Sequence, residues 1–146
     1  MKKIIVSACL LGDKCKYDGH SNYVPLVKQL REKFDIIPIC PEVNGGMSTP
    51  RTPSEIQGDR VVNQKGKDVT KYFDKGVQYV LGAVKYFDVQ IAVLKEKSPS
   101  CGVNKIYDGS FNGKLIDGQG WLTRELTKLG VKVYSEDQIE ELLNEN

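Results

Sequence analysis

Three cysteines each come just after a run of apolar residues, in the company of glycine or proline. They are Cys9, Cys40 and Cys101, and the last of them lies in the sequence SPSCG at 98–102. Thiolates bind zinc and iron–sulfur clusters, and three of them leave one metal position without a protein ligand. Free cysteines are also common as small buried core residues, so a purely structural role is the alternative.

The spacing of the three thiols does not decide between zinc and an iron–sulfur cluster. Cys15, which follows Cys9 in a polar segment, could close the site as a fourth ligand. We expect Cys15 instead to be a bystander. A disulfide between Cys9 and Cys15 is conceivable on oxidation but is not expected in a reducing compartment.

Side chains near the three thiols could carry acid–base and binding chemistry. Glu42 lies two positions after Cys40, where a carboxyl group can serve as a general acid or base. Arg51 stands in a proline-rich segment and could hold an anion or a carbonyl with its fork of donors. Ser98 and Ser100 offer hydroxyl groups beside Cys101. The alternatives are a solvated glutamate, a surface arginine and two turn serines.

Tyr17 and Asp18 could line the mouth of a pocket or simply form a turn. The single histidine, His20, has no nearby acceptor pattern and gives no basis for a catalytic triad. The sequence contains neither a P-loop nor a GxGxxG fingerprint, which argues against nucleoside triphosphates and dinucleotides as ligands.

Hydrophobic periodicity predicts the elements that would position these residues. In chain order we expect strands at 2–7, 36–39, 89–94 and 131–134, and helices at 24–34, 68–86, 120–129 and 136–143. We expect residues 41–67 to be one long functional loop and residues 105–118 to be a loop or a loose hairpin.

Strands that alternate with helices predict a single α/β domain over residues 1–146, with an open, doubly wound parallel sheet of about four strands, as in flavodoxin-like and Rossmann-like folds. In such a sheet the carboxyl ends of all strands lie along one edge, and ligands bind there. Cys9, Cys40 and Cys101 each follow a strand end, so we expect them to converge in space.

Composition limits the partners. Lys and Arg number 21 against 19 Asp and Glu, so no strongly basic surface for nucleic acid is expected. The apolar stretch near the N-terminus is too short for a secretion signal, and no segment approaches the ~20 apolar residues of a membrane helix. A cytoplasmic protein with reduced thiols and no membrane partner is therefore expected.

Three motifs resemble the DUF523 family, whose characterised members are thiouracil desulfidases. They are SACLLGDKCKYDG at 7–19, PICPEVNGGMSTPRTPSEI at 38–56 and LKEKSPSCG at 94–102, so the resemblance covers nearly the whole chain. It implies an α/β fold with a [4Fe-4S] cluster on Cys9, Cys40 and Cys101, whose fourth iron is free to take the sulfur of the substrate. It also implies that Glu42 is the catalytic carboxylate and Ser98 the catalytic serine.

The expected reaction is removal of sulfur from a thiolated uracil base or nucleotide by non-redox hydrolysis, giving uracil or UMP and hydrosulfide. Arg51, Tyr17, Asp18 and Ser100 are the expected substrate-binding residues. Two alternatives use the same thiols, namely a zinc-binding hydrolase or structural module, and a non-enzymatic carrier of metal or sulfur. The oligomeric state does not follow from the sequence.

Overall fold

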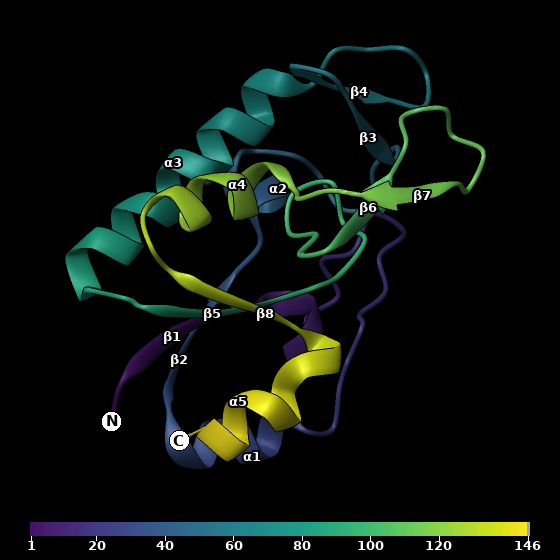
Figure 1. The fold of residues 1–146 in the computed structure, drawn as a ribbon. Coiled ribbons are helices and arrows are strands. Elements are labelled where there is room, and N and C mark those ends of the chain that lie inside the picture. Colours follow the sequence, from purple (N-terminus) through teal and green to yellow (C-terminus); the bar gives the residue numbers. More distant parts are fainter. Residues whose placement is uncertain (146) are drawn as a thin grey trace.

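The centre of the computed structural model, which describes residues 1–145, is a parallel sheet with helices on both faces (Figure 1). Its strands, in spatial order, are β2 (Asp35–Ile39), β1 (Lys3–Ser7), β5 (Ile91–Leu94) and β8 (Lys132–Ser135). All neighbouring strands pair in parallel. The chain steps from β1 outward to β2 and then to the other side of β1, which places a topological switch point between β1 and β5. The expected fold class is confirmed.

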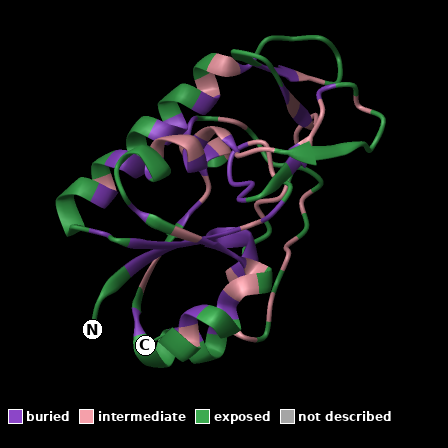
Figure 2. Cartoon of the chain, viewed as in Figure 1, coloured by how far each residue is buried: buried purple, intermediate pink, exposed green. Residues whose placement is uncertain are grey.

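Alternation of side chains along the strands builds two separate cores. Ile4 and Val6 of β1 face helices α1 (Val27–Lys33) and α5 (Ile139–Glu145). Ile5 faces the opposite core, which is covered by α3 (Thr70–Phe87) and α4 (Trp121–Lys128). All four residues of β5 are buried, as expected for a strand covered on both faces. Figure 2 shows the buried sheet between helices whose outer faces are exposed.

The segment 41–67, expected to be one long loop, is more structured than predicted. It contains the short helix α2 (Pro41–Asn44) and an antiparallel hairpin of β3 (Ser54–Gln57) and β4 (Arg60–Asn63). These elements are too short to show a clear periodicity in the sequence. The expected hairpin in 105–118 is confirmed as β6 (Lys105–Tyr107) and β7 (Leu115–Asp117).

Several element ends differ from the expected bounds. A turn at residues 25–26 precedes α1, and the last helical segment begins with the 3-10 turn η2 (Glu136–Gln138). A second 3-10 turn, η1 (Ala8–Leu11), follows β1 directly. Asp68, expected to be the N-cap, lies one residue before the N-cap of α3, and its carboxylate accepts a hydrogen bond from the Thr70 N–H at 2.9 Å. Across residues 1–145, no helix combines the length and the apolar character needed to span a membrane.

Helix α2 is fixed against α3 by two glycines. A Cβ atom on Gly76 would lie 1.8 Å from the carbonyl oxygen of Pro41, and one on Gly45 would lie 1.9 Å from that of Tyr72. No other residue type allows the two backbones to approach so closely. This contact sets the position of α2, which carries Glu42.

We expect Gly76→Ala to lower the free energy of unfolding by about 2 kcal/mol or more, because overpacking against rigid backbone typically costs ~1–3 kcal/mol. Gly82→Ala on the same helix is the matched control, since its Cβ meets nothing within 4 Å. That change should stabilise the chain by about 0.5–1 kcal/mol. Urea unfolding of both variants measures the difference, and equal stabilities would contradict the close contact.

Candidate functional site

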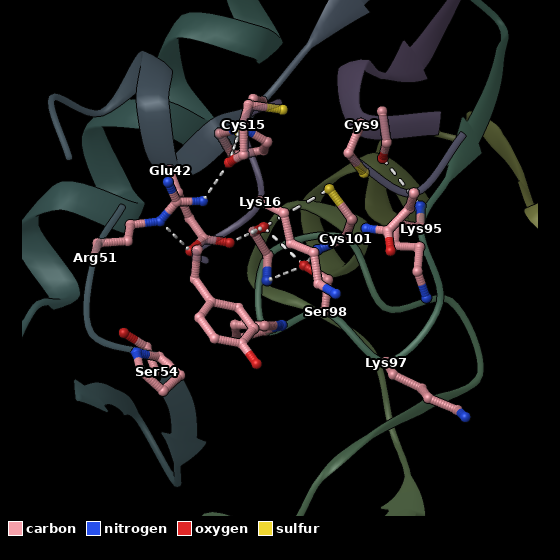
Figure 3. A pocket seen from close by; sticks show the side chains of 18 of the residues that line it. Cys9, Cys15, Lys16, Glu42, Arg51, Ser54, Lys95, Lys97, Ser98 and Cys101 are labelled. Atoms are coloured by element: carbon pink, nitrogen blue, oxygen red, sulfur yellow. Dashed lines mark hydrogen bonds and ion pairs between the residues drawn. The ribbon is translucent and has the colours of Figure 1, made fainter. Parts of the chain in front are cut away.

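A cavity of about 640 Å³ opens at the carboxyl end of the parallel sheet, and all four cysteines line it (Figure 3). Cys9 lies in η1 directly after β1, Cys40 follows β2, and Cys101 lies in the loop after β5. The structure thus brings Cys9, Cys40 and Cys101 together at the sheet edge where the strand order places them. All four cysteines are free, and Cys9 and Cys101 are buried.

The thiols differ in their surroundings. Burial raises the pKa of Cys9, and it raises the pKa of Cys101 to about 12. A hydrogen bond from the Cys15 thiol lowers the pKa of Cys40 to about 7, and the same bond raises the pKa of Cys15. A bound metal cation would stabilise the deprotonated form of buried thiols, so this donor set is suited to a thiolate-bound metal group.

Three thiols that line one cavity could each bind a different iron of a [4Fe-4S] cluster and leave the fourth iron without a protein ligand. Cys9, Cys40 and Cys101 offer such a set. Among residues 1–145, no group of three or more His, Cys, Asp or Glu side chains is arranged to hold a single metal ion.

A hydrogen-bonded chain links Ser98 to Glu42. The Ser100 hydroxyl donates to Glu42 Oε2 at 2.9 Å, and the Oγ atoms of Ser98 and Ser100 are 3.0 Å apart. Because the proton of Ser100 is engaged with Glu42, the Ser98 hydroxyl is the donor between the two serines. Ser100 is buried, whereas Ser98 is half-buried and lines the cavity. The chain therefore runs from the cavity to a shielded carboxylate.

Arg51 holds Glu42 and its neighbours in place. Its Nε donates to Glu42 Oε1 at 3.1 Å, and its Nη2 donates to the carbonyl oxygen of Cys15 at 2.9 Å. Nη1 donates to the carbonyl of Ser48 and to the hydroxyl of Thr49. Four donors of the guanidinium are thus engaged by the protein itself. This pattern points to a positioning role for Arg51 instead of the expected direct contact with substrate.

Tyr17 and Asp18 are two further residues expected to bind substrate, and only Tyr17 lines the cavity. Tyr17 lines the cavity and is partly exposed at its mouth. Asp18 does not line the cavity. Its carboxylate accepts a hydrogen bond from the His20 N–H at 3.0 Å and forms an ion pair with Lys16 at 3.6 Å, so it belongs to a turn.

Sequence reasoning missed Glu96, which organises the loop around Cys101. Glu96 is 8% exposed, and its Oε1 accepts hydrogen bonds from the backbone N–H groups of Val103, Asn104 and Lys105 at 2.7–3.0 Å. Burial acts to raise the pKa of Glu96, but these hydrogen bonds outweigh it and hold the pKa below its usual value. In the sequence Glu96 looks like an ordinary charged residue between two lysines.

The start of α4 supports the same loop from the other side. The N–H groups of Gly120, Trp121 and Leu122 donate to the carbonyl oxygens of Gly102, Pro99 and Ser100, at 2.8–2.9 Å. A Cβ atom on Gly120 would lie 2.6 Å from the Ser100 carbonyl, so glycine is required there. The SPSCG segment is therefore a rigid loop, held by Glu96 and by the helix.

Comparisons with known proteins identify relatives of this chain. The model of the 2-thiouracil desulfurase family matches residues 4–138. A Bacillus subtilis (strain 168) protein, "Uncharacterized protein YbbK", is 36% identical over 150 residues, which covers 96% of this chain and 99% of the relative. A solved structure of the [4Fe-4S]-dependent thiouracil desulfidase TudS (DUF523Vcz) superposes with a TM-score of 0.92 at 45% identity, covering 97% of this chain and 95% of that one.

We expect Glu96→Gln to lower the free energy of unfolding by about 1–3 kcal/mol near neutral pH, because hydrogen bonds to a buried charge are lost. Since the pKa of Glu96 is lower in the folded chain, its ionisation stabilises the fold above the ordinary value of 4.5. This contribution is lost as the pH falls below 4.5 toward the folded-state pKa, so the two proteins should converge in acid. Glu140→Gln, at an exposed position of α5, is the control and should change stability little. A difference between wild type and Glu96→Gln that persists unchanged in acid would contradict the role of the charge.

Proposed function

The chain belongs to the 2-thiouracil desulfurase family, and we propose that it is a [4Fe-4S]-dependent desulfidase acting on a thiolated uracil base or nucleotide. The products are uracil or UMP and hydrosulfide, formed by hydrolysis without net electron transfer. The observation that carries the proposal is one cavity that holds three strand-end thiols beside the Glu42–Ser100–Ser98 chain.

Cys9, Cys40 and Cys101 are the proposed cluster ligands, because Cys9 and Cys40 directly follow strands of the rigid sheet and Cys101 lies in a firmly held loop after a third strand. With three protein ligands, the bound cluster supplies one iron with an open position, which acts as a Lewis acid on the thiocarbonyl sulfur. Cys15 lines the same cavity but comes from a loop, and we assign it no ligand role.

Glu42 is the proposed general base and acid. It takes a proton from the water that attacks the ring carbon, and it returns the proton as the carbon–sulfur bond breaks, to the ring nitrogen or to the departing sulfur. Arg51 fixes the orientation of the carboxylate through the 3.1 Å contact with Oε1. Ser98 is the proposed hydrogen-bond donor to the developing negative charge, and its hydroxyl, which donates to Ser100 in the free protein, then turns toward the substrate.

We infer a free small molecule as substrate, because 21 Lys and Arg against 19 Asp and Glu provide no strongly basic surface for a nucleic acid. The four free cysteines agree with a reducing, cytoplasmic setting. Residues 1–146 are proposed to act as one desulfidase domain. A non-enzymatic carrier of metal or sulfur would have no use for the Glu42–Ser98 chain.

Anaerobic reconstitution tests the cofactor and the activity together. We expect about four irons and four sulfides per chain, a visible absorption band, and release of hydrosulfide from a thiouracil or its nucleotide. Cys9→Ser, Cys40→Ser and Cys101→Ser should each lose iron and activity, whereas Cys15→Ser, the matched control, should keep both. A colourless, folded protein containing zinc would contradict the proposal, and so would a brown protein that turns over no thiolated pyrimidine.

Variants of the hydrogen-bonded chain test the acid–base assignment. We expect Glu42→Gln to lower kcat by at least about 100-fold with full iron content, because general acid–base catalysis typically contributes 10²–10⁴-fold. Ser98→Ala should lower kcat by about 10- to 100-fold, comparable to the loss of one charge-stabilising donor, and Ser100→Ala by a smaller factor. Glu140→Gln serves as the control. Normal turnover by an iron-loaded Glu42→Gln protein would exclude Glu42 as the proton carrier.

A further inference from the structure

One wall of the cavity comes from the two hairpins and has no part in the proposed proton transfer. The hairpins β3–β4 and β6–β7 lie beside each other, and β4 packs against one end of α3 (Figure 1). Ser54 and Glu55 of β3 line the cavity together with Tyr107 at the end of β6 and Phe111 in the β6–β7 loop. Figure 3 shows Ser54 on the opposite side of the pocket from Cys9 and Cys101.

The β6–β7 loop is anchored to β3 through Glu55. The N–H groups of Gly109 and Phe111 donate to Glu55 Oε1 at 2.9 and 3.2 Å, and the Gln57 side chain donates to the Gly109 carbonyl at 2.9 Å. Three hydrogen bonds between two hairpins fix the backbone of the loop. The backbone that carries the cavity-lining side chains of this loop is therefore in place before any ligand binds.

Phe111 has a strained backbone conformation. Its φ angle is +59°, in the left-handed region that bulky residues rarely adopt. The bond from its own N–H to Glu55 helps to hold this conformation. Strained backbone conformations cluster at functional sites, so a strained aromatic residue in the wall of a cavity points to a functional role.

We propose that Phe111 forms the recognition wall for the pyrimidine ring, with its side chain against the aromatic face of the ring. Stacking on an aromatic side chain is favourable for any nucleobase because each has a π face. The inference rests on the proposed function, which makes a thiolated pyrimidine the substrate.

The test compares the dissociation constants of uracil and 5,6-dihydrouracil for the reconstituted protein. The two ligands carry the same carbonyl and N–H groups, but only uracil has an aromatic ring. Wild type should bind uracil more tightly. Phe111→Ala should weaken the binding of uracil by about tenfold, which is the scale of one stacked base. The dissociation constants of uracil and dihydrouracil should then agree to within about twofold. Phe111→Tyr should retain the ratio.

Tyr86→Ala, at an exposed aromatic position of α3, is the control and should change neither constant. Kinetics give a second readout, since Phe111→Ala should raise KM for thiouracil by a larger factor than it lowers kcat.

Two outcomes would overturn the inference. An unchanged ratio of the two constants in Phe111→Ala excludes stacking on Phe111, whether both ligands bind as before or both are weakened by the same factor. Loss of the ratio in Phe111→Tyr also excludes it. Wild-type turnover of thiouracil, measured on the same preparations, distinguishes the cases: without turnover the proposed function fails, and with turnover either result removes only the recognition wall.

Discussion

The carboxylate of Glu42 is the point at which the site is held together. Its two oxygens accept from Arg51 and from Ser100, and these residues come from different loops on either side of the sheet edge. Arg51 extends the connection to the Cys15 loop. Because Arg51 and Glu42 have side-chain exposures of only 6% and 12%, water competes little for these bonds. Loss of the carboxylate would leave a buried guanidinium without its charge partner.

Two parts of the fold hold the residues of the site, namely the sheet with its packed helices and the separately attached hairpins. The thiols are attached to the ends of β1, β2 and β5, whose side chains are packed between two helical layers. Helix α2 is fixed on α3 by backbone contact at Gly45 and Gly76, so Glu42 is held as firmly as the strand ends. The hairpin wall is attached separately, through Glu55. The proposed recognition wall can therefore vary without disturbing the residues proposed to hold the metal group or to move the proton.

Local sequence pattern was enough to predict the parallel sheet and the convergence of Cys9, Cys40 and Cys101, because alternating strands and helices put all strand ends along one edge of the sheet. The hairpin β3–β4 was missed because its four-residue strands are stabilised by packing against α3 and β6 and show little pattern of their own. The role of Glu96 was missed because its partners are backbone N–H groups, which no residue type marks in the sequence.

Cys15 shows that residue type alone does not identify a metal ligand. Four thiols line the cavity, and their chemistry is identical in the sequence. Their attachment differs. Cys9 and Cys40 directly follow strands, and Cys101 lies in a loop that is held by Glu96 and by the start of α4. Cys15 lies in an irregular segment whose carbonyl is held by Arg51 and whose thiol is turned toward Cys40. A metal ligand must be held within a fraction of an ångström of its bonding position, which strand ends and firmly held loops achieve better than irregular segments. The fold therefore separates the three proposed ligands from one neighbouring thiol that hydrogen-bonds to one of them.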